Sequence, residues 1–127
     1  MSNFLIDTID DPPFCEKLMD LCVENAAGFA RAQIDAGADT IGVGDAVVSQ
    51  LGPDVYARLV LPRQQRLFAA IREAGGLVRL HICGDTTPLL ELMPESGADS
   101  IDLAWMVDWP QAGARLGDRV PLCGNFD

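Results

Sequence analysis

The sequence has 127 residues, of which 49% are apolar, 22% charged and 6% aromatic. This composition is typical of a globular domain, or of a piece of a larger one, and it excludes a disordered chain. The 19 acidic residues outnumber the 9 basic ones and give a net charge of -10, so the surface should repel phosphate backbones and anionic lipids. We therefore expect neither nucleic acid nor a membrane as a partner.

The cysteines and the N-terminal segment indicate the compartment. Cys15, Cys22, Cys83 and Cys123 have no spacing typical of a disulfide framework, and no segment is long enough to span a bilayer. The N-terminal MSNFLIDTIDDPP has no basic region before its short apolar patch, so a signal peptide is not indicated. We expect a cytoplasmic protein with reduced thiols.

The first half of the chain predicts two long helices with a strand between them. Apolar residues recur at helical spacing from about 14 to 36, and Gly37 ends this pattern. DTIGVGD, residues 39–45, is typical of a short strand. Residues 52–76 are again helical in pattern, but Pro62 cannot donate the helix hydrogen bond, so we expect a break or kink there.

The second half alternates shorter elements. Strands are expected at LVRLHIC, ADSIDLAW and RVPLCGNFD, which are residues 77–83, 98–105 and 119–127. Residues 84–97 predict a short helix with Thr86 or Thr87 as its cap and Pro88 in its first turn. Residues 108–118 predict another, with Asp108 as the cap and Pro110 in the first turn.

This alternation favours an α/β fold with a parallel sheet and helices packed outside it. We expect four parallel strands near residues 39–44, 77–83, 99–104 and 120–124, with helices on one outer side. A closed (β/α)₈ barrel needs eight strands and typically about 250 residues. Residues 1–127 therefore predict a single partial domain, about half of such a barrel.

Polar residues gather where the predicted strands end. Asp45 ends the first strand, His81 and Cys83 end the second, Asp102 lies in the third, and Asn125 follows the fourth. Ligands bind at the carboxyl ends of strands in parallel α/β folds. These residues are candidates for a binding site, although Asp45 and Asn125 are also typical of ordinary turns.

His81 and Cys83 form an H-x-C pattern on a strand. Residues i and i+2 of a strand point to the same face, so the imidazole and the thiol converge there. Both are preferred zinc ligands. The alternative is a buried histidine bonded to a carboxylate, with an inert thiol beside it. Cys15 and Cys22 are expected to pack as small apolar residues, and nothing local marks Cys123 as a ligand.

From Asp11 onward the chain resembles the uroporphyrinogen decarboxylase superfamily. The resemblance is carried by VGDAVVSQLGPDVYARLVLPRQQRLFAAIREAGG and by HICGDTTPLLELMPESGADSIDLAWMVDWPQAGARLGDRVPLCGNFD. It implies a (β/α)₈ barrel of one of two branches. One branch decarboxylates uroporphyrinogen III without a cofactor, and the other contains zinc-dependent methyltransferases that move methyl from a corrinoid protein to a thiol such as coenzyme M.

The H-x-C pattern implies the methyltransferase branch, in which such a His and Cys bind zinc together with a later Cys. His81 and Cys83 match the first two ligands, whereas the third lies beyond Asp127 in that branch and Cys123 does not match it. The decarboxylase branch has a substrate-binding serine where Ala46 stands here, although Ser49 is close by. Its essential carboxylate belongs to an early strand that this sequence does not contain.

Three hypotheses follow for the activity. We favour a relative of the zinc-dependent methyltransferases, with a corrinoid protein and a small thiol as partners. The alternative is a uroporphyrinogen decarboxylase, a lyase whose tetrapyrrole acetates would pair with arginines such as Arg79. The third is a non-catalytic half barrel that forms a homo-oligomer, because unpaired sheet edges seek partners. Without the rest of the barrel we expect residues 1–127 alone to be inactive.

Overall fold

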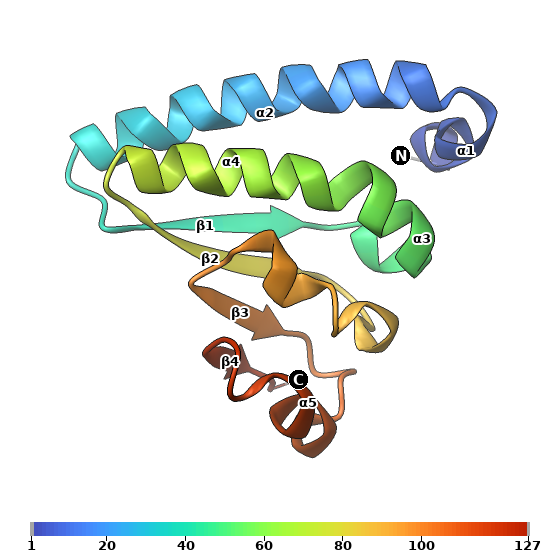
Figure 1. Cartoon of the computed structure of the whole chain (residues 1–127), viewed down its shortest axis with the longest axis vertical. Helices are drawn as coiled ribbons and strands as arrows, with labels where there is room; N and C mark the ends of the chain where they lie inside the picture. Colours follow the sequence, from blue (N-terminus) through green and yellow to red (C-terminus); the bar gives the residue numbers. More distant parts are fainter. Residues whose placement is uncertain (1, 127) are drawn as a thin grey trace.

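The computed structural model describes residues 2–126 and contains one sheet of four parallel strands (Figure 1). Their spatial order is the order of the sequence, β1-β2-β3-β4. The strands are β1 (Thr40–Asp45), β2 (Leu77–Ile82), β3 (Ser100–Leu103) and β4 (Leu122–Gly124). The predicted parallel sheet is confirmed, and the last two strands are shorter than the sequence suggested. Residue 127, at the end of the fourth predicted strand, lies outside the described residues.

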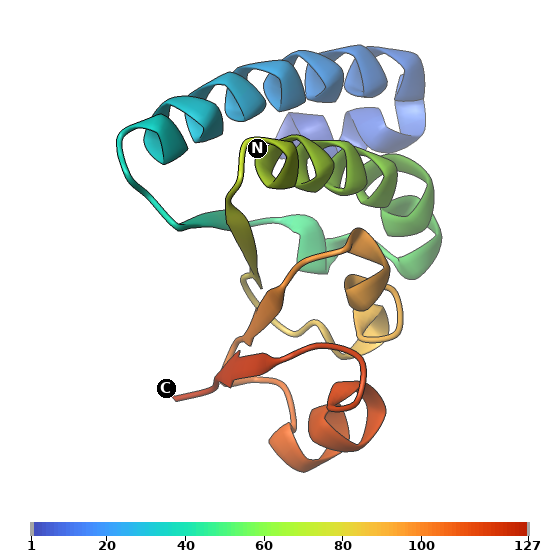
Figure 2. The same cartoon turned by 60° about the vertical axis from the view of Figure 1, so that its left-hand side comes forward.

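The helices lie on one side of this sheet (Figures 1 and 2). The long helix α2 (Pro12–Asp35) precedes β1, and α4 (Leu61–Glu73) connects toward β2. The segment after β3 forms α5 (Trp109–Leu116), which begins as predicted: the Asp108 carboxylate accepts from the Gln111 N–H at 2.7 Å, and proline occupies the first turn.

A short helix, α1 (Ser2–Asp10), precedes α2 and was not predicted from the sequence. It is too short to show a clear helical period and it depends on its neighbour, because Cys15 of α2 is fully buried and its thiol lies 3.9 Å from the Phe4 carbonyl oxygen. The Asp11 carboxylate then caps α2 by accepting from the Phe14 N–H at 3.1 Å. The expectation that Cys15 packs as an apolar residue agrees with its burial, whereas Cys22, for which the same was expected, is exposed.

The alternation of side chains along β2 divides the sheet into two faces. Val78, Leu80 and Ile82 are fully buried against the helices. Leu77, half exposed, lies on the opposite face, which we call the open face because no helix covers it. In a closed barrel this face would be the interior. Each strand therefore contributes alternate residues to the core and to the open face.

The expected break at Pro62 takes the form of a π-helical turn. Residues Pro53–Val55 form a turn of α-helix (α3), and the chain then widens over Tyr56–Val60 (η2), where the Leu61 N–H bonds to the Tyr56 carbonyl oxygen five residues earlier. The helix continues through Pro62 without a sharp stop. A π-turn is one of the ways in which a helix accommodates a residue that cannot donate.

Residues 84–97 do not form the predicted short α-helix. They form two 3₁₀ turns, Thr87–Leu89 (η3) and Met93–Ser96 (η4). Neither Thr86 nor Thr87 caps the first turn with its side chain; instead the Asp85 carboxylate accepts from the Thr87 N–H at 3.0 Å. Two prolines and an aspartate in fourteen residues favour tight turns over a continuous helix. Another short 3₁₀ turn, Val48–Gln50 (η1), follows β1.

Within the described residues no helix is long and apolar enough to cross a membrane.

The open face and the sheet edges generate a prediction about association. Within residues 2–126, β1 pairs only with β2 and β4 only with β3, so both edges present free backbone groups, and Leu77 is 53% exposed on the open face. We expect the chain to form a homo-oligomer, most simply a two-fold dimer, through this face. Light scattering at high micromolar concentration measures the mass.

Two variants test where the contact lies. Leu77→Glu places a charge on the open face and should shift the population toward monomer. Leu21→Glu makes the same change at an exposed position of α2, away from the open face, and should leave the mass unchanged. A monodisperse monomer of the unsubstituted chain would rule out the dimer.

Candidate functional site

An open depression lies at the carboxyl ends of the strands, on the open face, and has a volume of about 460 Å³. Of the residues singled out from the sequence, it is lined by Arg79, His81, Cys83, Asp102 and Asn125. The structure thus brings together side chains from three strands and the loops that follow them.

The register of the strands explains this convergence. Gly44 of β1 is paired with His81 of β2, His81 with Asp102 of β3, and Asp102 with Cys123 of β4. Paired residues of parallel neighbours point to the same side of the sheet, so this row of four places an imidazole, a carboxylate and a thiol on the open face. Glycine at the β1 end of the row leaves room beside His81.

Arg79 and Asp102 form an ion pair on this face. The Arg79 Nε donates to Asp102 Oδ2 at 2.6 Å, and the Asp102 carboxylate is the less exposed partner at 17% against 54% for the arginine side chain. The hydrogen bond and the charge of Asp102 raise the pKa of Arg79. Because only Nε is engaged with Asp102, the outer guanidinium nitrogens remain oriented away from this bond and are available to an anionic ligand.

Asn125 fastens the loop after β3 to the end of β4. Its Nδ2 donates to the Val107 carbonyl oxygen at 2.6 Å and to the Ala104 carbonyl oxygen at 3.3 Å. Both hydrogens of the amide are therefore engaged in holding the wall of the depression. This residue shapes the site as much as it lines it, and its Oδ1 is the atom that it can offer to a ligand.

Three exposed apolar residues line the rim and were missed by the sequence analysis. They are Trp105 and Met106, in the loop after β3, and Phe126, after β4. The available signal was Trp105, an aromatic residue two positions after the end of β3. Large apolar groups beside a polar floor suit an amphipathic ligand.

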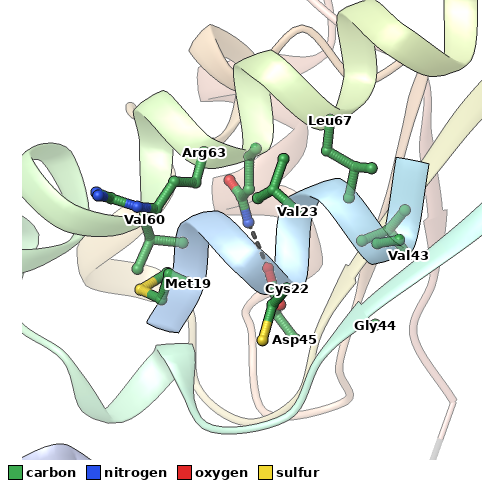
Figure 3. Close-up of a pocket in the computed structure, with 11 residues that line it drawn as sticks. Met19, Cys22, Val23, Val43, Gly44, Asp45, Val60, Arg63 and Leu67 are labelled. Atoms are coloured by element: carbon green, nitrogen blue, oxygen red, sulfur yellow. Dashed lines mark hydrogen bonds between the residues drawn. The ribbon is translucent and has the colours of Figure 1, made fainter. Parts of the chain in front are cut away.

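Asp45 lies apart from this depression. Along β1 the residues Ile41, Val43 and Asp45 point to the helix layer, so the carboxylate enters a different cavity of about 260 Å³ between α2, α4 and β1 (Figure 3). There Asp45 Oδ2 accepts from Gln64 Nε2 at 2.6 Å, and Gln64 Oε1 accepts from the Tyr56 hydroxyl at 2.7 Å. The sequence analysis grouped Asp45 with the other strand-end residues. It does not join them because its side chain, at an alternate position of β1, points to the helix layer and not to the open face.

Burial dominates the electrostatics of this second cavity. It raises the pKa of Asp45, and the hydrogen bond from Gln64 offsets part of that effect. It also raises the pKa of Tyr56, to which the nearby Asp45 charge contributes. The chain Asp45–Gln64–Tyr56 is thus a buried polar network that ties the end of β1 to α4.

Gly84 makes the turn that follows Cys83. Its φ of +96° is one that residues with a side chain rarely adopt, and a Cβ there would lie 2.6 Å from the Ser49 Oγ. The loop after β1 and the turn after β2 therefore touch at this point. The contact fixes how Cys83 leaves the strand toward the depression.

His81 and Cys83 both line the depression and offer the nitrogen and sulfur that zinc prefers. Cys83 is exposed and His81 is partly exposed, so neither side chain is fully buried in this chain. Within residues 2–126 no group of three or more His, Cys, Asp or Glu is placed to hold a metal ion. The two residues supply two of the donor types that a zinc ligand set uses.

Comparison with known proteins gives the family. The family model described as uroporphyrinogen decarboxylase (URO-D) matches residues 1–127, the whole chain. The chain belongs to the uroporphyrinogen decarboxylase family. The resemblance inferred from the sequence is confirmed at this level.

Curated members of the family show how much of their length this chain spans. It is 37% identical to the uroporphyrinogen decarboxylase of Streptomyces avermitilis over 117 residues, which are 92% of this chain and 33% of that enzyme. It is 41% identical to that of Thermus thermophilus over 111 residues, 87% of this chain and 32% of the relative. The chain spans about a third of the length of these relatives.

A solved structure has the same fold. The methyltransferase from Methanosarcina mazei matches with a TM-score of 0.89 at 26% identity, over 98% of this chain and 37% of the methyltransferase. The four strands and their helices thus correspond to part of a larger α/β barrel in a uroporphyrinogen decarboxylase family protein.

The contact between Gly84 and Ser49 predicts the effect of a methyl group. Gly84→Ala should lower the free energy of unfolding by about 1–2 kcal/mol, because a side chain is placed in a left-handed conformation and against Ser49. Gly42→Ala adds the same methyl group to a strand glycine with free space around it and should be neutral or slightly stabilising. Urea denaturation measures both. Equal effects of the two substitutions would mean that the Gly84 turn is not constrained in this way.

The partly buried Asp45 predicts a pH-dependent gain in stability. The pKa of Asp45 is raised in the folded state, so wild-type stability falls as the pH rises through that value and the carboxylate ionises inside the protein. Asp45→Asn should therefore stabilise the protein at pH 7, and the gain should shrink toward about pH 3, where the carboxyl is protonated in both states. Thermal unfolding across this range measures the difference.

Asp39→Asn, at an exposed position, changes the net charge by the same amount and serves as the control. A substitution at Asp45 that lowers stability most at neutral pH would contradict the prediction.

Proposed function

We propose that this chain is part of a methyltransferase of the zinc-dependent branch of the family, which moves methyl from a corrinoid protein to a small thiol. The observation that carries the proposal is the position of His81 and Cys83, which line one depression at the carboxyl end of β2. A ligand pair of this kind has no role in the cofactor-independent decarboxylation that the other branch performs.

The residues of this chain would serve the reaction as follows. His81 and Cys83 would bind zinc with one further ligand from outside residues 1–127. When bound, zinc holds the acceptor thiol as a thiolate, the form of sulfur that is nucleophilic. Transfer forms a carbon–sulfur bond, breaks the carbon–cobalt bond with its electron pair left on cobalt, and releases the thiol proton.

The other residues of the depression would bind the two substrates. Arg79, with outer nitrogens free of its bond to Asp102, would hold an anionic group of the thiol or of the corrinoid. Trp105, Met106 and Phe126 at the rim would cover the apolar parts of the donor. The chain also has the fold of the Methanosarcina mazei methyltransferase, although both branches of the family share this fold.

The second candidate is a uroporphyrinogen decarboxylase. It is favoured by the names of the curated relatives, which are 37% and 41% identical, and by the presence of Arg79 on the open face to pair with a substrate acetate. Two features weigh against it. Ala46 stands where this branch has a substrate-binding serine, and Cys83 is not typical of it.

Zinc binding separates the two candidates. Adding zinc to the chain should raise its melting temperature and release protons, because Cys83 must ionise to bind. With two protein ligands we expect a dissociation constant in the micromolar range or weaker. Cys83→Ser should abolish the stabilisation, whereas Cys123→Ser should leave it nearly intact.

The same experiment has two outcomes that would count against the proposal. Loss of the zinc effect in Cys123→Ser would mean that β4 builds the metal site. A wild-type chain that zinc does not stabilise would favour the decarboxylase.

Substitution of Co²⁺ for zinc extends the test to the thiol substrate. Thiolate bound to Co²⁺ absorbs by charge transfer, so adding 2-mercaptoethanesulfonate should increase this absorption in the wild type. In Cys83→Ser the increase should be lost.

A further inference from the structure

Asp102 occupies the centre of the candidate site. It is paired in register with His81 on one side and with Cys123 on the other, and all three lie on the open face. Its side chain is 17% exposed, and it is the one acidic residue among the described residues that line the depression. A carboxylate in this position needs hydrogen-bond donors for both oxygens.

Only one of these oxygens has a donor. Oδ2 accepts from Arg79 Nε at 2.6 Å, whereas Oδ1 is buried and has no hydrogen-bond partner among the described residues. A buried carboxylate oxygen without a partner costs free energy, so a donor within reach should turn toward it. The Arg79 bond holds the carboxylate in place and leaves Oδ1 for a neighbour.

Besides Arg79, which already donates to Oδ2, two side chains beside Asp102 carry a hydrogen that they could donate. Neighbouring strands are about 4.8 Å apart, so the paired residues His81 and Cys123 are both near enough in principle. The imidazole N–H is a strong donor, whereas a thiol is a weak one. His81 is therefore the better donor, with its ring turned toward β3.

We propose that Asp102 is a positioning residue that accepts a hydrogen bond from one ring nitrogen of His81 through Oδ1. The bond fixes the tautomer and the orientation of the ring, so that the other nitrogen is the unprotonated one that faces the depression. Histidines that bind metals are commonly oriented in this way by a carboxylate, whose loss weakens metal affinity by about 10–100-fold. Arg79 acts one step further out, because it holds Asp102.

The test uses the fact that His81 is the only histidine in the chain. At alkaline pH, where histidine rings are neutral, the nitrogen chemical shifts of a single imidazole report its tautomer directly. The zinc-free wild type should show one predominant tautomer. Asp102→Asn should move the shifts toward the mixture seen in a free histidine, because an amide is a weaker acceptor than a carboxylate.

The experiment also has a matched control and a second measurement, the zinc dissociation constant. Asp118→Asn removes the same charge at an exposed turn and should leave the His81 shifts unchanged. The zinc dissociation constant should rise about tenfold or more in Asp102→Asn and stay constant in the control. A wild-type spectrum with the free-histidine mixture would overturn the proposal without any variant, even if Asp102→Asn fails to fold.

The zinc part of this inference rests on the proposed function, but the tautomer part does not. Asp102→Asn that alters the tautomer in a chain that binds no zinc would sustain the role of Asp102 and refute the zinc site. If Asp102→Asn binds zinc as tightly as the control Asp118→Asn and its tautomer is unchanged, the zinc site would be sustained and the role of Asp102 refuted.

Discussion

The helix layer on one face of a parallel sheet is the constraint on which the rest of the structure depends. Because side chains alternate along each strand, every second residue enters the core and the residues between them face the site. Val78, Leu80 and Ile82 supply the core of β2, and the residues between them face the depression. Any shift of one residue in the register would exchange the two sets.

Much of this arrangement could be predicted from the sequence. Four apolar strands alternating with helical segments were enough to give a parallel sheet, and the i, i+2 spacing of His81 and Cys83 placed them together. Asp45 shows the limit of that reasoning. Its place at the end of a strand was predicted correctly. Which face of the sheet its side chain occupies was harder to predict, because two of the six residues of β1 are glycines and few side chains show the alternation.

The remaining differences come from tertiary contacts that a local pattern does not contain. α1 is held by its packing against α2, and the π-turn before Pro62 is supported by Arg63, whose Nη1 donates to the Leu59 carbonyl oxygen at 2.9 Å. Residues 84–97 follow the local preferences of proline and aspartate more than the apolar spacing. The rim of the depression consists of loop residues whose role is set only when the strand ends are brought together.

The Arg63 side chain has a further consequence for how the chain holds together. Besides Leu59 it contacts α2, with Nε 3.1 Å from Asp20 Oδ1 and Nη2 3.3 Å from the Glu16 carbonyl oxygen. Arg63, which follows Pro62 in α4, thus ties that helix to α2. This guanidinium therefore holds α2 against α4 at a place far along the chain from the loop that leads from α2 into β1.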